Sequence, residues 1–119
     1  MNQRLILFSF FLLFLLGCLS SQKSGNPKSK IKLADELFMQ EYYWDAARYY
    51  QEAYDSDTGN VHLTHKLAEA YYFSRDYKNA ETYYELVMSK SDMLYPLDRI
   101  KYSECMKRNG NYAGAKLGY

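Results

Sequence analysis

Cysteine is scarce in this chain of 119 residues, which holds only two, Cys18 and Cys105. Two thiols cannot build a disulfide framework or a thiolate metal site. Cys105 is therefore expected to behave as a small buried apolar residue. The chain also lacks an excess of charge of either sign. It has 15 basic and 14 acidic side chains, and without Arg4, which lies in the apolar leader, 14 basic side chains remain against 14 acidic ones. Nucleic acid, whose phosphates attract an excess of Lys and Arg, is not an expected partner.

Recognisable catalytic motifs are also missing. The sequence has no glycine-rich phosphate loop after a strand, no serine or cysteine nucleophile with a placed base, and no paired acids in a known frame. We therefore predict a protein that is not an enzyme and that takes no cofactor and no small-molecule substrate. A catalytic domain encoded further downstream is the alternative to this prediction.

The first residues form an apolar leader. Leu5 to Leu16 is almost wholly apolar and follows the positive charge of Arg4, as in a secretory signal. A membrane span needs about 20 apolar residues, and Gly17 and the polar "SSQKSG" end this run earlier. Residues 1–17 are therefore predicted to be a cleaved signal peptide rather than a permanent span.

The end of the leader, "LLGC" at Leu15 to Cys18, resembles the lipobox of bacterial lipoproteins. The resemblance implies that Cys18 becomes the lipidated first residue of the mature chain and holds it to a membrane through acyl chains such as palmitate. An ordinary signal peptide with an incidental cysteine is the alternative. Leu19 stands where an aspartate would direct retention in the inner membrane, so by resemblance the outer membrane is expected, with the protein facing the periplasm.

The segment after Cys18 changes to "SSQKSGNPKSK", which is poor in apolar residues, so residues 18–30 are predicted to be a lipidated flexible tether. From Ile31 onward, apolar residues recur at spacings of three and four, which predicts amphipathic helices and an all-α domain. Asn60 and Asp76 are expected to cap helices that start at Val61 and Tyr77. Pro96 suits a first helical turn, and Gly110 a turn between helices.

The helical pattern repeats at a spacing of 34 residues, which aligns Ala46 with Ala80 and Tyr50 with Tyr84. A third copy follows at a spacing of 35, with Ala115 and Tyr119 in register. This resembles the tetratricopeptide repeat, a helix-turn-helix unit that stacks into a solenoid. The resemblance implies about three repeats over residues 31–119. The early tryptophan common in that family is absent.

The last repeat is incomplete, since Tyr119 falls halfway along its second helix. We expect that the domain is truncated at its C-terminus and that the protein continues. The alternative is a short last helix whose exposed edge is covered by a partner.

One helical face gathers His62, His65 and Glu69, which could bind zinc. Their spacing departs from known helical zinc motifs, so no metal is predicted. By resemblance, the same face lines a concave groove that binds a peptide or a protein. The groove positions implied by the family are Asp35, Phe38, Met39, His62, His65, Glu69, Tyr72, Phe73, Leu97, Ile100, Glu104, Lys107 and Arg108. The lysine and asparagine clamp for a free carboxylate is absent.

The tyrosine-rich repeats look similar to the amino-terminal repeats of a family of Bacteroidetes outer-membrane proteins. Members carry a β-propeller and a peptidoglycan-binding domain like that of outer membrane protein A, and some serve type IX secretion and gliding. The resemblance implies a scaffold for protein–protein interaction that links outer membrane, cell wall and secretion machinery. A stand-alone lipoprotein, acting as an assembly factor or as a pilotin-like partner of an outer-membrane complex, is the alternative.

Overall fold

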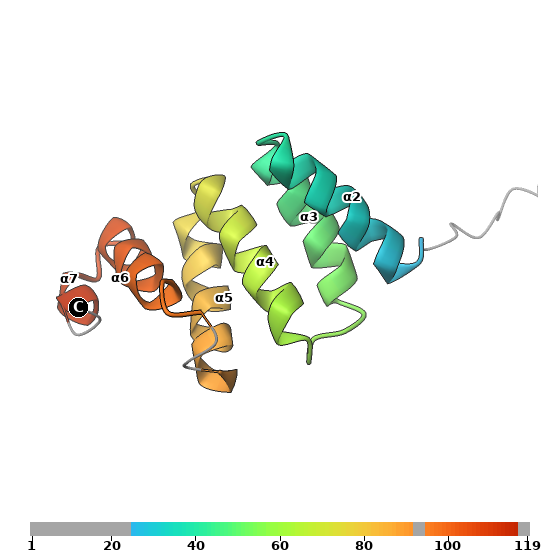
Figure 1. Ribbon diagram of the computed structural model, residues 1–119. Helices are drawn as coiled ribbons and strands as arrows, with labels where there is room; N and C mark the ends of the chain where they lie inside the picture. The colour runs from blue at the N-terminus through green and yellow to red at the C-terminus, as the bar shows by residue number, and fades with distance from the viewer. Residues whose placement is uncertain (1–24, 92–94, 117–119) are drawn as a thin grey trace, which may run out of the picture.

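A computed structural model describes residues 25–91 and 95–116 of the chain (Figure 1). The described part is helical and contains no strand, which confirms the all-α prediction. The signal peptide, Cys18 and Tyr119 lie outside the described residues. The helices are α2 (Pro27–Met39), α3 (Tyr43–Tyr54), α4 (Val61–Phe73), α5 (Tyr77–Lys90), α6 (Asp98–Arg108) and α7 (Tyr112–Lys116).

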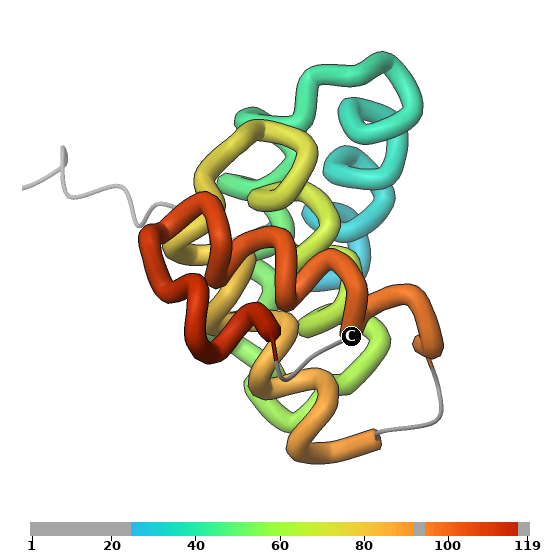
Figure 2. Tube along the Cα trace, turned by 90° about the vertical axis from the view of Figure 1, so that its left-hand side faces the viewer, coloured from blue at the N-terminus to red at the C-terminus, as the bar shows by residue number. Residues whose placement is uncertain are grey.

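Successive helices pack against one another in hairpins. The pairs α2 with α3, α4 with α5 and α6 with α7 follow each other in a row, and α3 packs on α4 as α5 packs on α6 (Figure 1). Figure 2 looks along this row from the end formed by α6 and α7. The two ends of the row are therefore different surfaces, one made by the first pair and one by the last.

The turns within the three pairs share one backbone geometry. Glu41, Arg75 and Gly110 have positive φ angles of 65°, 65° and 88°. After each of them, a backbone N–H reaches back five residues to a carbonyl, from Tyr42 to Leu37 and likewise from Asp76 and Asn111. A left-handed residue followed by this bond is the Schellman ending of a helix. The chain reverses in the same way at positions spaced 34 and 35 residues apart.

Helix starts follow the capping residues. The side chain of Asn60 accepts from the backbone N–H of Leu63 at 3.1 Å, and that of Asp76 accepts from Asn79 at 3.2 Å. The predicted helix starts at Val61 and Tyr77 are confirmed. Each cap satisfies a backbone donor that the first turn of a helix leaves without a partner.

Two predicted boundaries are wrong by a few residues. The tether was expected to reach Lys30, but α2 begins at Pro27, where Asn26 accepts from the backbone N–H of Lys28 at 3.0 Å. Proline suits this first position because it has no N–H to satisfy. Pro96 lies in the turn before α6 rather than in its first helical turn, because α6 begins at Asp98.

The interior lies between the hairpins and is built from alanines and tyrosines. The alanines at the repeated positions, Ala46, Ala80 and Ala115, are buried, and this lets neighbouring helices approach closely. Tyr50 and Tyr84 fill the space beside them. Cys105 is buried in the second of the two clusters, as predicted from its isolation in the sequence.

Candidate binding groove

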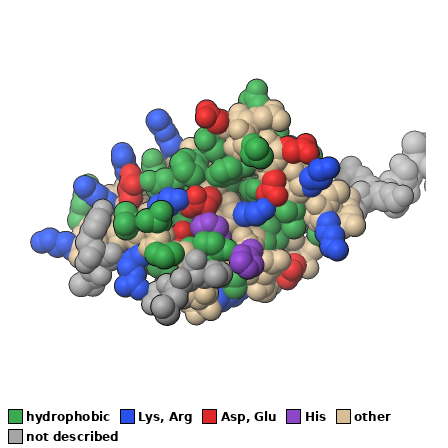
Figure 3. All heavy atoms as spheres, viewed as in Figure 1, with side chains coloured by type: hydrophobic (Ala, Val, Ile, Leu, Met, Phe, Trp, Pro, Cys, Tyr) green, Lys and Arg blue, Asp and Glu red, His purple; other side chains and the backbone are tan. Residues whose placement is uncertain are grey.

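A hollow of about 560 Å³ opens on the face formed by α2 and α4. Figure 3 shows this face, with hydrophobic side chains and charges of both signs around the two histidines. The structure places six of the predicted groove residues in its lining, together with three that the sequence reasoning did not include. The predicted ones are Asp35, Phe38, Met39, His62, His65 and Glu69, and the added ones are Tyr50, Lys66 and Tyr95.

The remaining predicted residues do not line this hollow. Glu104, Lys107 and Arg108 line a separate one of about 500 Å³, together with Tyr112. Leu97 and Ile100 are exposed large apolar side chains on α6. Tyr72 and Phe73 lie at the end of α4, where Phe73 contacts Phe38 with ring centroids 5.8 Å apart. The predicted positions therefore fall partly in this hollow and partly outside it.

One wall of the hollow is a carboxylate held by two donors. Asp35 on α2 accepts a hydrogen bond from the hydroxyl of Tyr50 on α3. The ammonium of Lys66 on α4 lies 2.6 and 2.8 Å from its two oxygens. Burial and the Asp35 carboxylate together raise the pKa of Tyr50, because both disfavour a phenolate. Tyr50 therefore stays a neutral donor at physiological pH.

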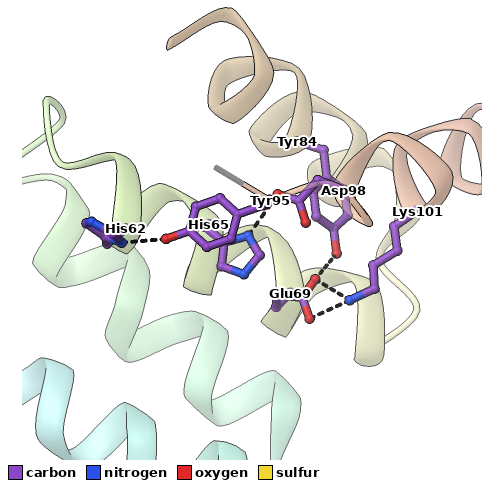
Figure 4. Close-up of polar contacts among 7 residues, drawn as sticks. All are labelled: His62, His65, Glu69, Tyr84, Tyr95, Asp98 and Lys101. Carbon is purple, nitrogen blue, oxygen red and sulfur yellow. Dashed lines mark hydrogen bonds and ion pairs between the residues drawn. The ribbon is translucent and has the colours of Figure 1, made fainter. Parts of the chain in front are cut away.

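The same arrangement recurs in the next hairpin. Glu69 on α4 accepts from the hydroxyl of Tyr84 on α5, and the ammonium of Lys101 on α6 lies 2.6 and 2.7 Å from its oxygens (Figure 4). Burial, followed by the Glu69 carboxylate, raises the pKa of Tyr84. Each network joins a hairpin to the first helix of the following one.

His62 and His65 on α4 contact Tyr95, which precedes α6. The ring of His65 stacks on that of Tyr95, with centroids 3.6 Å apart and planes within 1°. Its Nδ1 lies 2.8 Å from Oδ2 of Asp98, whose side chain is buried (Figure 4). His62 hydrogen-bonds the hydroxyl of the same tyrosine. Tyr95 thus covers part of the histidine pair and narrows that side of the hollow.

A metal-ligand set is present in a different form from the one considered in the sequence. His65, Glu69 and Asp98 offer ligand atoms within 4.8 Å of one another, and His62 does not belong to this set. Each of the three is already engaged, since Lys101 neutralises Glu69 and His65 bonds Asp98. A cation here would have to displace the Lys101 ammonium, which lies 2.6 Å from the Glu69 carboxylate.

Aromatic rings continue from the hollow towards the turns. Tyr43 stacks on Phe73 with centroids 5.1 Å apart, and the Lys101 ammonium lies 5.4 Å from the Phe73 ring. The hydroxyl of Tyr72 donates to Glu104, and this bond, followed by burial, raises the pKa of Tyr72. Phe73 is 42% exposed and Met39 84%, so an apolar surface remains available beside the charges.

Cys105 is the one cysteine among the described residues. Burial, followed by the charges of Glu81 and Glu104, raises the pKa of its thiol to about 12. A thiol with such a pKa stays protonated near neutral pH and is a poor nucleophile. It serves packing rather than chemistry.

The residues that sequence reasoning missed left a signal in the sequence. Asp35 and Glu69 are 34 residues apart, as are Tyr50 and Tyr84, while Lys66 precedes Lys101 by 35. Recurrence of acid, tyrosine and lysine at the repeat spacing marks a contact that is repeated between successive hairpins. Tyr95 left no such signal, because its contacts with His62 and His65 join positions that are distant in the sequence and belong to no repeated pair.

No protein-family model matches the chain, and the search of curated proteins finds no significant relative. Within the described residues, no helix combines the length and the apolar character needed to span a bilayer.

Proposed function

We propose that this protein is a non-enzymatic scaffold for protein–protein interaction, built as a tetratricopeptide solenoid and anchored to the bacterial outer membrane through Cys18. The hollow on the α2 and α4 face carries the proposal. It joins exposed apolar side chains to fixed charges of both signs, which is what an extended peptide with mixed side chains needs. Ligand sites gain orientation from a few fixed polar groups within an apolar lining.

The repeat identity rests on two observations. The Schellman turns at Glu41, Arg75 and Gly110 recur at the spacing of the sequence repeat. The buried alanines and tyrosines occupy the small and aromatic positions that the family uses where its two helices cross. Both support a solenoid of helix-turn-helix units.

The proposed ligand is a polypeptide segment of mixed character. Met39 in the hollow and Phe73 beside it offer apolar contacts, while His62 is exposed and its ring can donate or accept a hydrogen bond. Asp35 and Glu69 are each neutralised by a lysine, so these two carboxylates give the lining no strong net charge. A strongly charged ligand would therefore gain little from them.

The proposed location in the cell rests only on the resemblance of Leu15 to Cys18 to a lipobox. A triacylated Cys18 would hold the domain on the periplasmic side of the outer membrane, in reach of cell wall and type IX secretion or gliding components. Incorporation of labelled palmitate into the wild-type protein and its loss in Cys18→Ser would support the anchor. Wild-type protein that takes up no label would contradict the lipid anchor at Cys18.

Site-specific photocrosslinking in the native cells tests the scaffold. A photoreactive amino acid at Met39, which lines the hollow and is 84% exposed, should capture one defined protein, whereas the same group at Trp44, which is 63% exposed and outside the lining, should not. Identification of the product separates a wall-linked secretion scaffold from an assembly factor or a pilotin-like partner. Equal capture from Trp44 would show that the hollow is not the binding surface.

A further inference from the structure

One ring nitrogen of His65 has no partner. Its Nδ1 lies 2.8 Å from Oδ2 of Asp98, but no hydrogen bond joins its Nε2 to any group of residues 25–91 and 95–116. Among these same residues, no buried side-chain nitrogen or oxygen lacks a hydrogen-bond partner. Nε2 is therefore an accessible atom of a half-buried residue. Because His65 lines the hollow, this nitrogen is open to a ligand there.

Asp98 sets the form of the imidazole. A carboxylate can only accept a hydrogen bond, so in a neutral ring bonded to it the proton lies on Nδ1, and Nε2 keeps a bare lone pair. Asp98 is 1% exposed and lies in the first turn of α6, where the helix favours a negative charge. Nε2 is thus an acceptor whose tautomer is fixed by a buried acid.

Tyr95 holds the ring in place. The two rings stack with centroids 3.6 Å apart and planes within 1°, so the imidazole of His65 cannot swing away without losing this contact. Figure 4 shows the second ring nitrogen on the side of the ring away from the bond to Asp98. A group that is already oriented loses little freedom when a ligand binds, and this favours affinity.

His62 is not fixed in the same way. Its Nδ1 hydrogen-bonds the hydroxyl of Tyr95, which can either donate or accept, so this bond does not choose a tautomer. His62 is also exposed. Of the two histidines in the hollow, His65 is the one that presents a defined acceptor.

The charges around the hollow limit the kind of donor that can reach this acceptor. The ammonium groups of Lys66 and Lys101 each lie 2.6 Å from a carboxylate, that of Asp35 or Glu69. A ligand ammonium would face these like charges and find both carboxylates already neutralised. A carboxylate of the ligand would meet the lone pair of Nε2. An uncharged donor avoids both conflicts.

We propose that the hollow selects a polypeptide segment through an uncharged hydrogen-bond donor, an amide N–H or a hydroxyl, that binds Nε2 of His65. Asp98 acts as the positioning residue that sets the tautomer. Phe38 and Met39 line the same hollow and receive a large apolar side chain beside the donor. This inference rests on the proposed peptide-binding function and adds the chemistry that the ligand must carry.

Nitrogen NMR tests the tautomer without any ligand. Protein with ¹⁵N-labelled histidines, its membrane anchor held in detergent, is measured at about pH 8, where histidine side chains in general are mostly neutral. His65 should carry its proton on Nδ1 and none on Nε2. In Asp98→Asn the amide can donate to Nδ1 as well as accept from it, so both tautomers should appear. A proton on Nε2 in the wild-type protein would overturn the proposal.

Peptide selection tests the ligand chemistry. Random short peptides displayed on phage are panned against the same protein at the same pH, and binders that are lost with Met39→Glu are kept, since this exposed side chain lines the hollow. Each donor of a kept peptide is then blocked in turn, by N-methylation of an amide or removal of a hydroxyl. One block should weaken binding about fivefold to tenfold in the wild-type protein and far less in His65→Phe.

His62→Phe is the matched control, and the loss caused by blocking that donor should persist in it. If His65→Phe lacks native helix content because Asp98 has lost its partner, Asp98→Asn gives the same comparison with a reduced loss. A Met39-dependent peptide in which no blocked donor depends on His65 or Asp98 would overturn this inference and leave the peptide groove standing. A failure to select any Met39-dependent peptide would overturn both.

Discussion

The hydroxyl of Tyr84 donates a hydrogen bond to Glu69 across the α4–α5 hairpin, and Tyr50 repeats this contact with Asp35 in the α2–α3 hairpin. Each acid is shared with a lysine of the next hairpin. A single carboxylate therefore holds together three helices, two of its own hairpin and one of the neighbour. The stack is tied by polar networks at its edge and by alanines in its interior.

Tyr84→Phe is expected to lower the free energy of unfolding by about 1–2 kcal/mol, since Glu69 loses a donor in a place that water reaches poorly. Tyr50→Phe is the matched control and should cost less, because the side chain of Asp35 is 40% exposed while that of Glu69 is 15% exposed. Urea unfolding followed by circular dichroism measures both. A larger loss for Tyr50→Phe would contradict the ranking.

Much of the fold could be predicted because its signals are local. The capping side chains of Asn60 and Asp76 predict where two helices start. Alanines at a fixed spacing predict where helices cross closely. The sequence pattern does not predict the first turn of α2, because Lys28 to Lys30 has no apolar periodicity. The helix starts there nevertheless, because Asn26 caps it and Pro27 suits its first position.

The candidate site was predicted only in part, because its geometry depends on contacts between distant segments. The face shared by His62 and His65 follows from helical spacing alone. The stacking of Tyr95 on His65, and the pairing of Asp98 with the same ring, depend on the loop between α5 and α6. No local rule reports such contacts.

The turns offer a test of backbone strain. Arg75 has a φ of 65° without being glycine, which disfavours its backbone by about 1 kcal/mol or more. Arg75→Gly should therefore raise the free energy of unfolding by about 0.5–1 kcal/mol, after the larger entropy of an unfolded glycine is subtracted. Differential scanning calorimetry should show a higher Tm.

Gly110 provides the reverse comparison for the turn prediction. Its φ is 88°, and a Cβ added there meets nothing within 4 Å, so Gly110→Ala isolates the backbone cost. The expected loss is about 1 kcal/mol. If Arg75→Gly and Gly110→Ala shift the Tm in the same direction, the strain of the left-handed backbone does not explain the change in Tm.

The pair formed by His65 and Asp98 should contribute to docking of α6 on α4. Asp98 is 1% exposed, so Asp98→Ala removes the acceptor of a buried bond and should lower the free energy of unfolding by about 2–3 kcal/mol. Asp98→Asn keeps shape and an acceptor and should cost about half as much. Chemical denaturation compares the two, and equal losses would show that the carboxylate charge, which both variants remove, matters rather than the shape and the hydrogen bond that Asp98→Asn keeps.

Stability should fall in alkaline solution, because the structure raises the pKa of Tyr50 and Tyr84 above the ordinary 10.0 and that of Cys105 from 9.0 to about 12. Below these ordinary values both folded and unfolded chains keep the protons, and the stabilisation is complete. Above them the unfolded chain releases protons that the folded chain retains, so unfolding becomes easier by up to about 1.4 kcal/mol per pH unit for each group.

The free energy of unfolding should therefore stay level from about pH 7 to pH 9 and decline above that, first through Cys105 and then through the tyrosines. Tyr84→Phe should decline less steeply above about pH 10, since one proton is removed from the balance. Urea titrations at a series of pH values measure the slopes for the wild-type protein and for Tyr84→Phe, and identical slopes would contradict the assignment to Tyr84.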